Sequence, residues 1–389
     1  MNSFAVSALL ASVLFIGCTN AAPSGGIEDA VLETQDGSKF RVETVAAGLE
    51  VPWGFAWLPN GDMLVTERPG RVRMIQKGKL RDEPVYEVPD VEPSGESGLM
   101  DVSIHPQFAA NSYVYLAYAY NADGKHVKVV RFKFVAEKFT EPMAIIEKIP
   151  AAPNHAGTRA RFGPDGKLYV TTGDATDWDL AQDNMSLAGK TLRLNDDGSV
   201  PKDNPFIGRE GYRPEIFSTG HRNAQGLAWQ PGSGLMFQTE HGPSHFEARG
   251  GGADEVNIVE RGKNYGWPTI YGTKTQAGLE PPLLDIPEEY SPACAPASAA
   301  FYSGEKLPAF KGNFFFGCLR GARLIRVVLD GRKVVKQENL LVGNLGRVRE
   351  VGEGPDGFLY LSTSNRDGRG SPDKNDDRIL RLVTVEKTP

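Results

Sequence analysis

Pro164-Asp165-Gly166-Lys167-Leu168-Tyr169-Val170-Thr171-Thr172 combines a tight turn with a short apolar strand. Pro-Asp-Gly favours the turn, and the apolar residues that follow it are typical of a buried strand. Similar phrases occur at 59–67, 231–240 and 355–363. Because one turn-and-strand unit recurs along the chain, the sequence predicts a radial repeat architecture.

Partner strands lie between the repeated phrases. Residues 113–120 and 126–134 flank Asn121-Ala122-Asp123-Gly124, and 324–329 and 332–335 flank Asp330-Gly331, so both regions read as hairpins. No helical periodicity extends beyond a turn or two. The spacing predicts an all-β propeller of five or six four-stranded blades, closed by pairing of 378–385 with 40–45.

Composition is that of a folded, acidic protein. The 389 residues are 40% hydrophobic and 24% charged, with a net charge of −6. No run of Lys or Arg could cover a phosphate backbone, so nucleic acid is not expected as a partner.

The N-terminal region reads as an export signal. Residues 5–16 are apolar but too short to cross a bilayer, and Ala21-Ala22-Pro23 follows them. Phe15-Ile16-Gly17-Cys18 resembles a bacterial lipoprotein box, which would lipidate Cys18; the alternative is cleavage near Ala22. We therefore expect a signal at 1–22, a linker at 23–38 and a propeller domain at 39–389, in a periplasmic or lipid-anchored protein of a bacterial envelope.

Two further cysteines, Cys294 and Cys318, remain in the expected mature chain. An oxidising compartment favours a disulfide between them, and the alternative is a pair of buried free thiols.

Polar residues beside the predicted strands are the candidates for chemistry. His155 is followed by Ala156 and Gly157, so little bulk would shield it, and histidine is the usual proton acceptor in catalysis. A loop histidine bonded to a backbone carbonyl is the alternative. Arg222 and Asn223 could present a cation and an amide to an oxyanion, or could simply cover a blade edge.

Two further groups suggest ion binding. The loop containing Gly242 and Pro243, with Glu255 further on, offers the oxygen ligands that suit Ca²⁺, although an ordinary acidic loop would look similar. Arg347 and Arg349 share one face of a predicted strand. With Arg222 and Arg320 such a face would bind an anion, and a solvated strand face is the alternative. Together, these groups suit a small ligand with several carboxylates.

An ordered set of motifs carries a resemblance to a known family. The chain resembles, over about 45–383, the soluble PQQ-dependent glucose dehydrogenases, and more closely their aldose sugar dehydrogenase branch. The motifs are Gly95-Glu96-Ser97-Gly98-Leu99-Met100-Asp101-Val102 with His105-Pro106, Asn154-His155, Gly189-Lys190-Thr191-Leu192-Arg193-Leu194-Asn195, Pro201-Lys202-Asp203-Asn204-Pro205, Gly220-His221-Arg222-Asn223-Ala224-Gln225-Gly226, Glu240-His241-Gly242-Pro243 and Asn264-Tyr265-Gly266-Trp267-Pro268.

The resemblance implies a six-bladed propeller of four-stranded antiparallel blades that holds PQQ and Ca²⁺ at one mouth. It implies oxidation of the C1 hydroxyl of aldose sugars to lactones, with electrons passed to an external acceptor. His155 matches the general base that acts while hydride moves to PQQ, and Arg222 and Asn223 match the pair that contacts the quinone oxygens.

Other matches concern the cofactor and the metal. The carbonyls of Gly242 and Pro243 match ligands of the Ca²⁺ that polarises PQQ, and Arg347 and Arg349 match arginines that hold PQQ carboxylates. A second, structural Ca²⁺ site of the aldose dehydrogenase branch is matched by two further residues, Glu255 and Tyr265.

The chain departs from the family at several positions. Glu96 stands where many members have Gln, and Arg320 stands where a PQQ-contacting Lys is common. Glu96, Asn154 and Arg320 are still expected at the cofactor. The Cys294/Cys318 pair is not part of the family pattern, and 269–279 matches too poorly for any PQQ contact to be assigned.

Two other functions compete with this one. A non-catalytic propeller could serve as a binding module, since fold does not fix function. It would not need His155, Arg222 and Asn223 together. A metal-dependent lactonase would need more side-chain ligands than the sequence offers. A nicotinamide cofactor is not expected, because no Gly-rich dinucleotide fingerprint opens a helix.

Overall fold

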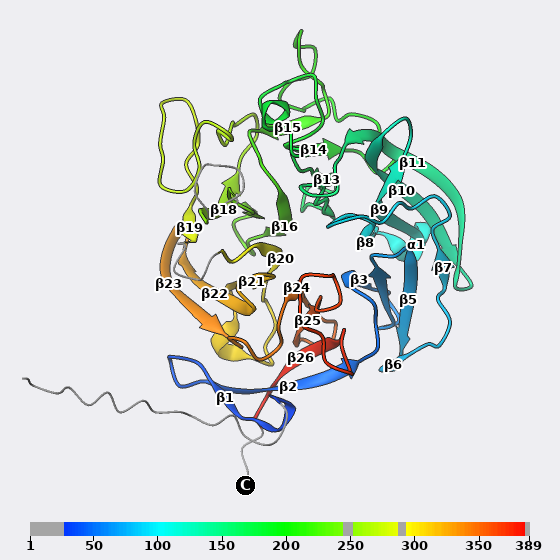
Figure 1. The fold of residues 1–389 in the computed structure, drawn as a ribbon, viewed down its shortest axis with the longest axis vertical. Helices are drawn as coiled ribbons and strands as arrows, with labels where there is room; N and C mark the ends of the chain where they lie inside the picture. Colours follow the sequence, from blue (N-terminus) through cyan, green and yellow to red (C-terminus); the bar gives the residue numbers. More distant parts are fainter. Residues whose placement is uncertain (1–26, 244–251, 287–292, 386–389) are drawn as a thin grey trace, which may run out of the picture.

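Antiparallel strands arranged around a central axis make up nearly all of the regular secondary structure in the computed structural model, which describes residues 27–243, 252–286 and 293–385 (Figure 1). The described strands form six sheets. Helical structure among them consists of α1 (Phe108–Asn111) and the short 3-10 helices η1 (Ile27–Asp29), η2 (Trp178–Ala181) and η5 (Pro308–Phe310). The structure confirms the predicted all-β, six-bladed propeller.

Each blade is a meander of antiparallel strands. The first consists of β3 (Pro52–Trp57), β4 (Met63–Glu67), β5 (Arg71–Gln76) and β6 (Lys79–Leu80), with β7 (Tyr86–Glu87) also paired to β5. The second and third are β8 (Leu99–Ile104), β9 (Tyr113–Asn121), β10 (Lys125–Val135) and β11 (Lys138–Pro150), then β12 (Ala160–Phe162), β13 (Leu168–Thr171), β14 (Lys190–Leu194) and β15 (Ile216–Thr219). The fourth and fifth are β16 (Ala224–Trp229), β17 (Met236–Glu240), β18 (Asp254–Val259) and β19 (Leu284–Ile286), then β20 (Pro296–Phe301), β21 (Phe314–Cys318), β22 (Arg323–Asp330) and β23 (Lys333–Leu340).

The last blade closes the ring by combining both ends of the described chain. It contains β24 (Val348–Glu353), β25 (Leu359–Thr363) and β26 (Ile379–Thr384), with β2 (Lys39–Ala46) paired to β26 and β1 (Leu32–Glu33) paired to β2. Pairs such as Phe40↔Thr384 and Val42↔Leu382 confirm the predicted closure. Part of the stretch predicted as a linker therefore belongs to this sheet through β1.

The repeated phrase marks the second strand of a blade. Its four copies are β4, β13, β17 and β25, whereas β3, β8, β12, β16, β20 and β24 lie nearest the axis. The strand β17, which ends at Glu240, is therefore a second strand and not an innermost one. A second strand has a strand on each side and a blade on each face, so every residue of β4, β13, β17 and β25 is buried, including the polar residues at their ends. The innermost strands carry polar residues towards the axis.

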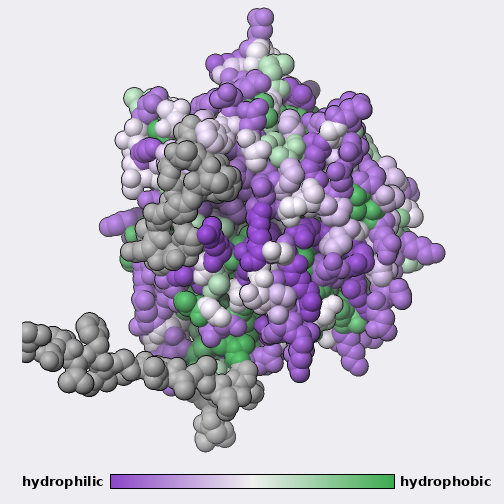
Figure 2. Space-filling model, in the orientation of Figure 1, coloured by the Kyte–Doolittle hydropathy of each residue, from purple (hydrophilic) through white to green (hydrophobic). Residues whose placement is uncertain are grey.

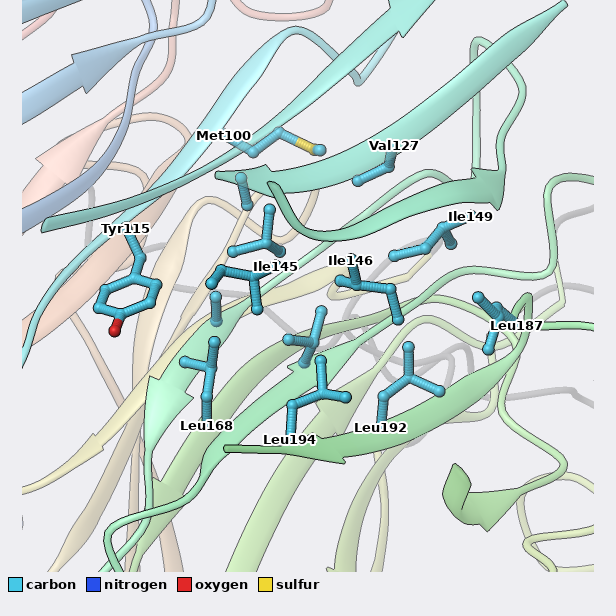
Figure 3. Packing of buried hydrophobic residues seen from close by; sticks show 14 of the residues in the cluster. Met100, Tyr115, Val127, Ile145, Ile146, Ile149, Leu168, Leu187, Leu192 and Leu194 are labelled. Atoms are coloured by element: carbon cyan, nitrogen blue, oxygen red, sulfur yellow. The ribbon is translucent and has the colours of Figure 1, made fainter. Parts of the chain in front are cut away.

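Successive blades pack face to face through apolar side chains. Between the second and third blades, Ile145 and Ile146 of β11 lie against Leu168, Leu192 and Leu194 (Figure 3). All five side chains are buried. This packing holds the blades at fixed angles, and with them the loops that join them.

Four charged side chains fill the axis between the two ends of the innermost strands. Arg159 donates to Asp101 at 2.7 Å and to Glu350 at 2.6 Å. Arg161 pairs with the same two carboxylates. Because each charge has partners of the opposite sign, the network is neutral as a whole and joins three blades.

The face seen along the axis is mostly hydrophilic, with apolar side chains in small separate patches (Figure 2). None of the helices in the described ranges has the length and apolar character that a membrane-spanning helix needs. The predicted export signal and Cys18 lie outside the described residues.

Candidate active site

A cavity of about 530 Å³ opens where the innermost strands begin. Its walls are the loops that precede these strands, together with the loops that follow the second strands. The lining includes nine of the residues predicted from the sequence to bind a cofactor, bind a metal or act in catalysis: Glu96, Asn154, His155, Arg222, Gly242, Pro243, Arg320, Arg347 and Arg349.

His155 lies in the loop that leads into β12 and is buried in the cavity wall. Its backbone is left-handed, with φ of 54°. The backbone N–H of His155 donates to Glu96 Oε2 at 3.3 Å, and its carbonyl accepts from Ala175 N at 3.2 Å. A Cβ at Gly173 would collide with that carbonyl, so glycine is required where the His155 loop crosses the end of β13. An uncommon conformation held by specific contacts is typical of functional positions.

Two neighbours hold the imidazole ring of His155. Nδ1 lies 2.8 Å from Asp174 Oδ1, and Nε2 lies 2.8 Å from Arg222 Nη2. A guanidinium can only donate and an ionised carboxylate can only accept. We therefore assign the proton to Nδ1, which leaves the lone pair of His155 on Nε2.

Asp174 is a functional residue that the sequence analysis missed. It is fully buried, and its second oxygen, Oδ2, accepts from Trp267 Nε1 at 2.8 Å. Oδ1 also accepts from Thr176 N at 2.8 Å. The signal available in the sequence was that a carboxylate follows β13 directly, only 19 positions after His155.

Arg222 and Asn223 lead into β16 and are buried. Arg222 Nη1 donates to the carbonyl of His241 at 3.1 Å, and the guanidinium lies 5.4 Å from the ring of Trp267. Asn223 does not line the cavity but lies just behind it. Its Oδ1 accepts from Gly157 N at 3.1 Å, and its Nδ2 donates to Glu96 Oε2 at 3.3 Å. Arg222 and Asn223 are thus both brought beside the His155 loop, as predicted.

The loop after β17 brings His241, Gly242 and Pro243 to the cavity. A Cβ at Gly242 would collide with the carbonyls of Gly252 and Ala253, so the loop lies directly against the start of β18. Burial lowers the pKa of His241 to about 4. Its Nε2 is buried and has no hydrogen-bond partner among the residues that the structure describes.

The remaining arginines make the cavity strongly cationic. Arg347 donates to Asp367 at 2.8 Å, and Arg349 Nε donates to Ser364 Oγ at 3.0 Å. Burial lowers the pKa of Arg349 to about 10, so it remains protonated at neutral pH. Arg320, as predicted, lines the mouth, and its side chain forms no ion pair with the residues that the structure describes.

Arg68 and Arg369 also line the cavity, and the sequence analysis missed both. Neither belongs to one of the motifs quoted from the sequence. Arg68 reaches the cavity from the loop after β4, and Arg369 from the loop after β25. Counting described residues only, six arginines and three carboxylates (Glu96, Asp254 and Asp367) line the cavity. The excess of positive charge favours an anionic ligand.

A disulfide braces one wall. Cys294 and Cys318 are bonded, which confirms the predicted disulfide. The backbone N–H of Arg320 donates to the carbonyl of Cys294 at 3.1 Å. Asp254 Oδ2 accepts from Cys294 N at 2.8 Å, while Oδ1 accepts from Gly242 N at 2.8 Å. The bridge and Asp254 therefore fix the Arg320 and Gly242 loops relative to each other.

Glu255 and Tyr265 do not line this cavity. Glu255 is buried on β18 opposite Glu240 of β17, and Gly272 N donates to it at 2.7 Å. The hydroxyl of Tyr265 donates to the carbonyl of Ile258 at 2.6 Å. Within the described ranges, no group of three or more His, Cys, Asp or Glu side chains is placed to hold a metal ion. Both assignments to a metal site therefore stay predictions.

The chain is similar to known proteins over most of its length. The model of the glucose/sorbosone dehydrogenase family matches residues 49–381. Aldose sugar dehydrogenase YliI of Escherichia coli is 37% identical over 84% of this chain and 91% of its own. Quinoprotein glucose dehydrogenase B of Acinetobacter calcoaceticus is 28% identical over 69% of this chain and 62% of its own.

Solved structures show the same relationship. The PQQ-bound form of an aldose sugar dehydrogenase from Streptomyces coelicolor is 35% identical, covers 89% of this chain and 98% of its own, and superposes with a TM-score of 0.77. These similarities confirm the resemblance carried by the motifs: the chain belongs to the glucose/sorbosone dehydrogenase family.

Proposed function

We propose that this protein is a PQQ- and Ca²⁺-dependent oxidoreductase that oxidises the C1 hydroxyl of aldose sugars to lactones. One observation carries the proposal. The Asp174–His155–Arg222 chain presents a base at the wall of a cavity whose charge suits a polycarboxylate. Relatives named as aldose sugar and quinoprotein glucose dehydrogenases support the choice of cofactor and substrate class.

The lining residues fit PQQ. Arg320, Arg347 and Arg349 would hold its carboxylates, and Arg222 would face its quinone oxygens. Asn223, just behind the cavity wall, would be the second member of the pair at these oxygens. The buried, unpartnered Nε2 of His241 offers one more polar contact that a ligand would satisfy. When bound, PQQ would supply the acceptor for the hydride that leaves C1 of the sugar.

The loop after β17 fits a hard cation. Carbonyl oxygens are ligands that Ca²⁺ prefers, and Gly242 and Pro243 place two of them at the cavity wall. When bound there, Ca²⁺ would supply a Lewis acid. Glu255, paired with Glu240 across neighbouring strands, and Tyr265 are proposed to hold a second, structural Ca²⁺.

Residues of the protein itself would accept the proton of the sugar C1 hydroxyl. Nε2 of His155 would take the proton of the C1 hydroxyl, because the Nδ1 proton is committed to Asp174. The resulting imidazolium would then lie beside a buried carboxylate, which stabilises its charge. Arg222, which donates to Nε2 in this structure, would release it for the substrate and place its own charge near the oxygen that becomes negative.

The cellular setting is also proposed. The disulfide supports an oxidising compartment outside the cytoplasm, with electrons passed to an external acceptor. A lipid anchor at Cys18 would tether the propeller to the membrane.

The test is a titration of the apo-protein with PQQ, with and without Ca²⁺, followed by addition of aldoses. We expect stoichiometric binding that needs Ca²⁺, and loss of the quinone absorption when sugar is added. Failure to bind PQQ in the presence of Ca²⁺ would overturn the proposal and favour a non-catalytic binding module.

A further inference from the structure

One carboxylate in the wall of this cationic cavity is Glu96. Glu96 Oε1 accepts from Arg369 Nη1 at 2.6 Å. Burial favours the neutral form of Glu96, but the attraction of His241 and of Arg369, together with the hydrogen bond from Arg369, outweighs burial and lowers its pKa to about 2. Glu96 therefore carries a negative charge where an anionic ligand is expected.

Arg369 reaches over the cavity from the loop after β25. Its Nη2 donates to Asn154 Oδ1 at 2.7 Å, so one guanidinium bridges Glu96 and Asn154. The other oxygen of Glu96, Oε2, accepts from His155 N and from Asn223 Nδ2, each at 3.3 Å. Glu96 thus links Arg369 to His155 and Asn223 through hydrogen bonds.

We propose that Arg369 is the positioning residue that makes Glu96 compatible with an anionic ligand in this cavity. The Glu96–Arg369 pair is neutral and still offers hydrogen-bonding groups, so it acts as an amide would at the same place. Without Arg369, the negative charge of Glu96 would repel the ligand. The Glu96 side chain would also lose the hydrogen bond that holds it at the mouth of the cavity. The identity of the ligand rests on the proposed function, whereas the compensation of charge does not.

A double-mutant cycle tests this pairing through binding affinity. The dissociation constant would be measured by calorimetry for PQQ with Ca²⁺, and separately for benzene-1,3,5-tricarboxylate as a simple polyanion. We expect Arg369→Met to weaken binding about tenfold or more, since one partner of a charge pair is removed. Adding Glu96→Gln to that variant should restore most of the affinity, and Arg369→Lys should give an intermediate loss.

The matched control is Arg332 with Glu260, a surface pair at 3.1 Å that lies outside the cavity. Arg332→Met should leave both affinities unchanged. Equal losses of affinity in Arg369→Met and in the double variant would overturn the proposal, because Arg369 would then bind the ligand directly. An unchanged affinity in Arg369→Met would also overturn it. If the protein binds the tricarboxylate but not PQQ, the proposed function fails and the cycle is read with the tricarboxylate. If it binds neither, both proposals fail.

Discussion

At the scale of single residues, opposite charges on either side of His155 fix its tautomer. Nδ1 keeps its proton for Asp174, so the lone pair that can accept a substrate proton is on Nε2, which accepts from Arg222 in this structure. The sequence predicted His155 and Arg222 as members of one site, and the structure brings them within 2.8 Å. It could not identify Asp174 as the third member, because that contact depends on the left-handed turn at His155 and on the close approach at Gly173.

Replacing Asp174 tests the role of the carboxylate. Asp174→Asn should slow reduction of bound PQQ by sugar roughly 10²–10⁴-fold, because an amide stabilises neither the tautomer nor the imidazolium. PQQ affinity should change little, since Asp174 does not line the cavity. The measurement is the rate of quinone bleaching at saturating sugar. Asp179→Asn, an exposed carboxylate in η2, is the control. A wild-type rate in Asp174→Asn would contradict the assigned role.

Replacing His155 separates binding from chemistry. His155→Ala should abolish sugar-dependent reduction while PQQ still binds, because the arginines that hold the ligand remain in place. Spectroscopic titration with PQQ and single-turnover reduction measure the two properties on one sample. Sugar reduction that persists at the wild-type rate would show that another group is the base.

At the scale of elements, the site is built by the loops before the innermost strands and the loops after the second strands. The recurring phrase predicted strands and turns but not their order in a blade, since second strands and innermost strands are both short and largely buried. The residues that separate loops bring together were harder still to predict from the sequence. Arg68 and Arg369 reach the cavity from separate blades, and no local pattern records that meeting.

At this scale, we predict that the disulfide stabilises the folded protein. It closes a separation of 24 residues and joins the loop before β20 to the end of β21. Cys294→Ser/Cys318→Ser should lower the free energy of unfolding by about 3 kcal/mol, because the unfolded chain regains loop entropy. Denaturation with and without reductant measures this loss. Reductant should leave the free energy of unfolding of the double variant unchanged. If reductant also leaves that of the wild-type protein unchanged, the bridge does not contribute to stability.

At the scale of the whole molecule, the ring is held by its closure and by the ionic network on its axis. The closing pair of strands was predictable, because both ends of the domain read as strands. The axial network was not, since its four charges come from three blades and each looks like an ordinary surface residue in the sequence.

Breaking the axial network should destabilise the propeller. Asp101 is fully buried and accepts from Arg159, from Arg161 and from the backbone of Ala160. Asp101→Asn leaves buried guanidinium charge unbalanced and should lower the free energy of unfolding by about 3–5 kcal/mol. Glu260→Gln, in an exposed pair, should cost less than about 1 kcal/mol. Equal stability losses in chemical denaturation would show that the axis contributes no more than a surface pair.

The most direct measurement is anaerobic reduction of stoichiometrically bound PQQ by an aldose deuterated at C1, compared with the same sugar carrying hydrogen. If the cavity oxidises C1 with His155 as the base, the quinone band should bleach in a single turnover, more slowly with the deuterated sugar. A bound quinone that no aldose reduces, or a rate that deuterium at C1 does not change under conditions where chemistry limits the rate, would contradict sugar oxidation at this site.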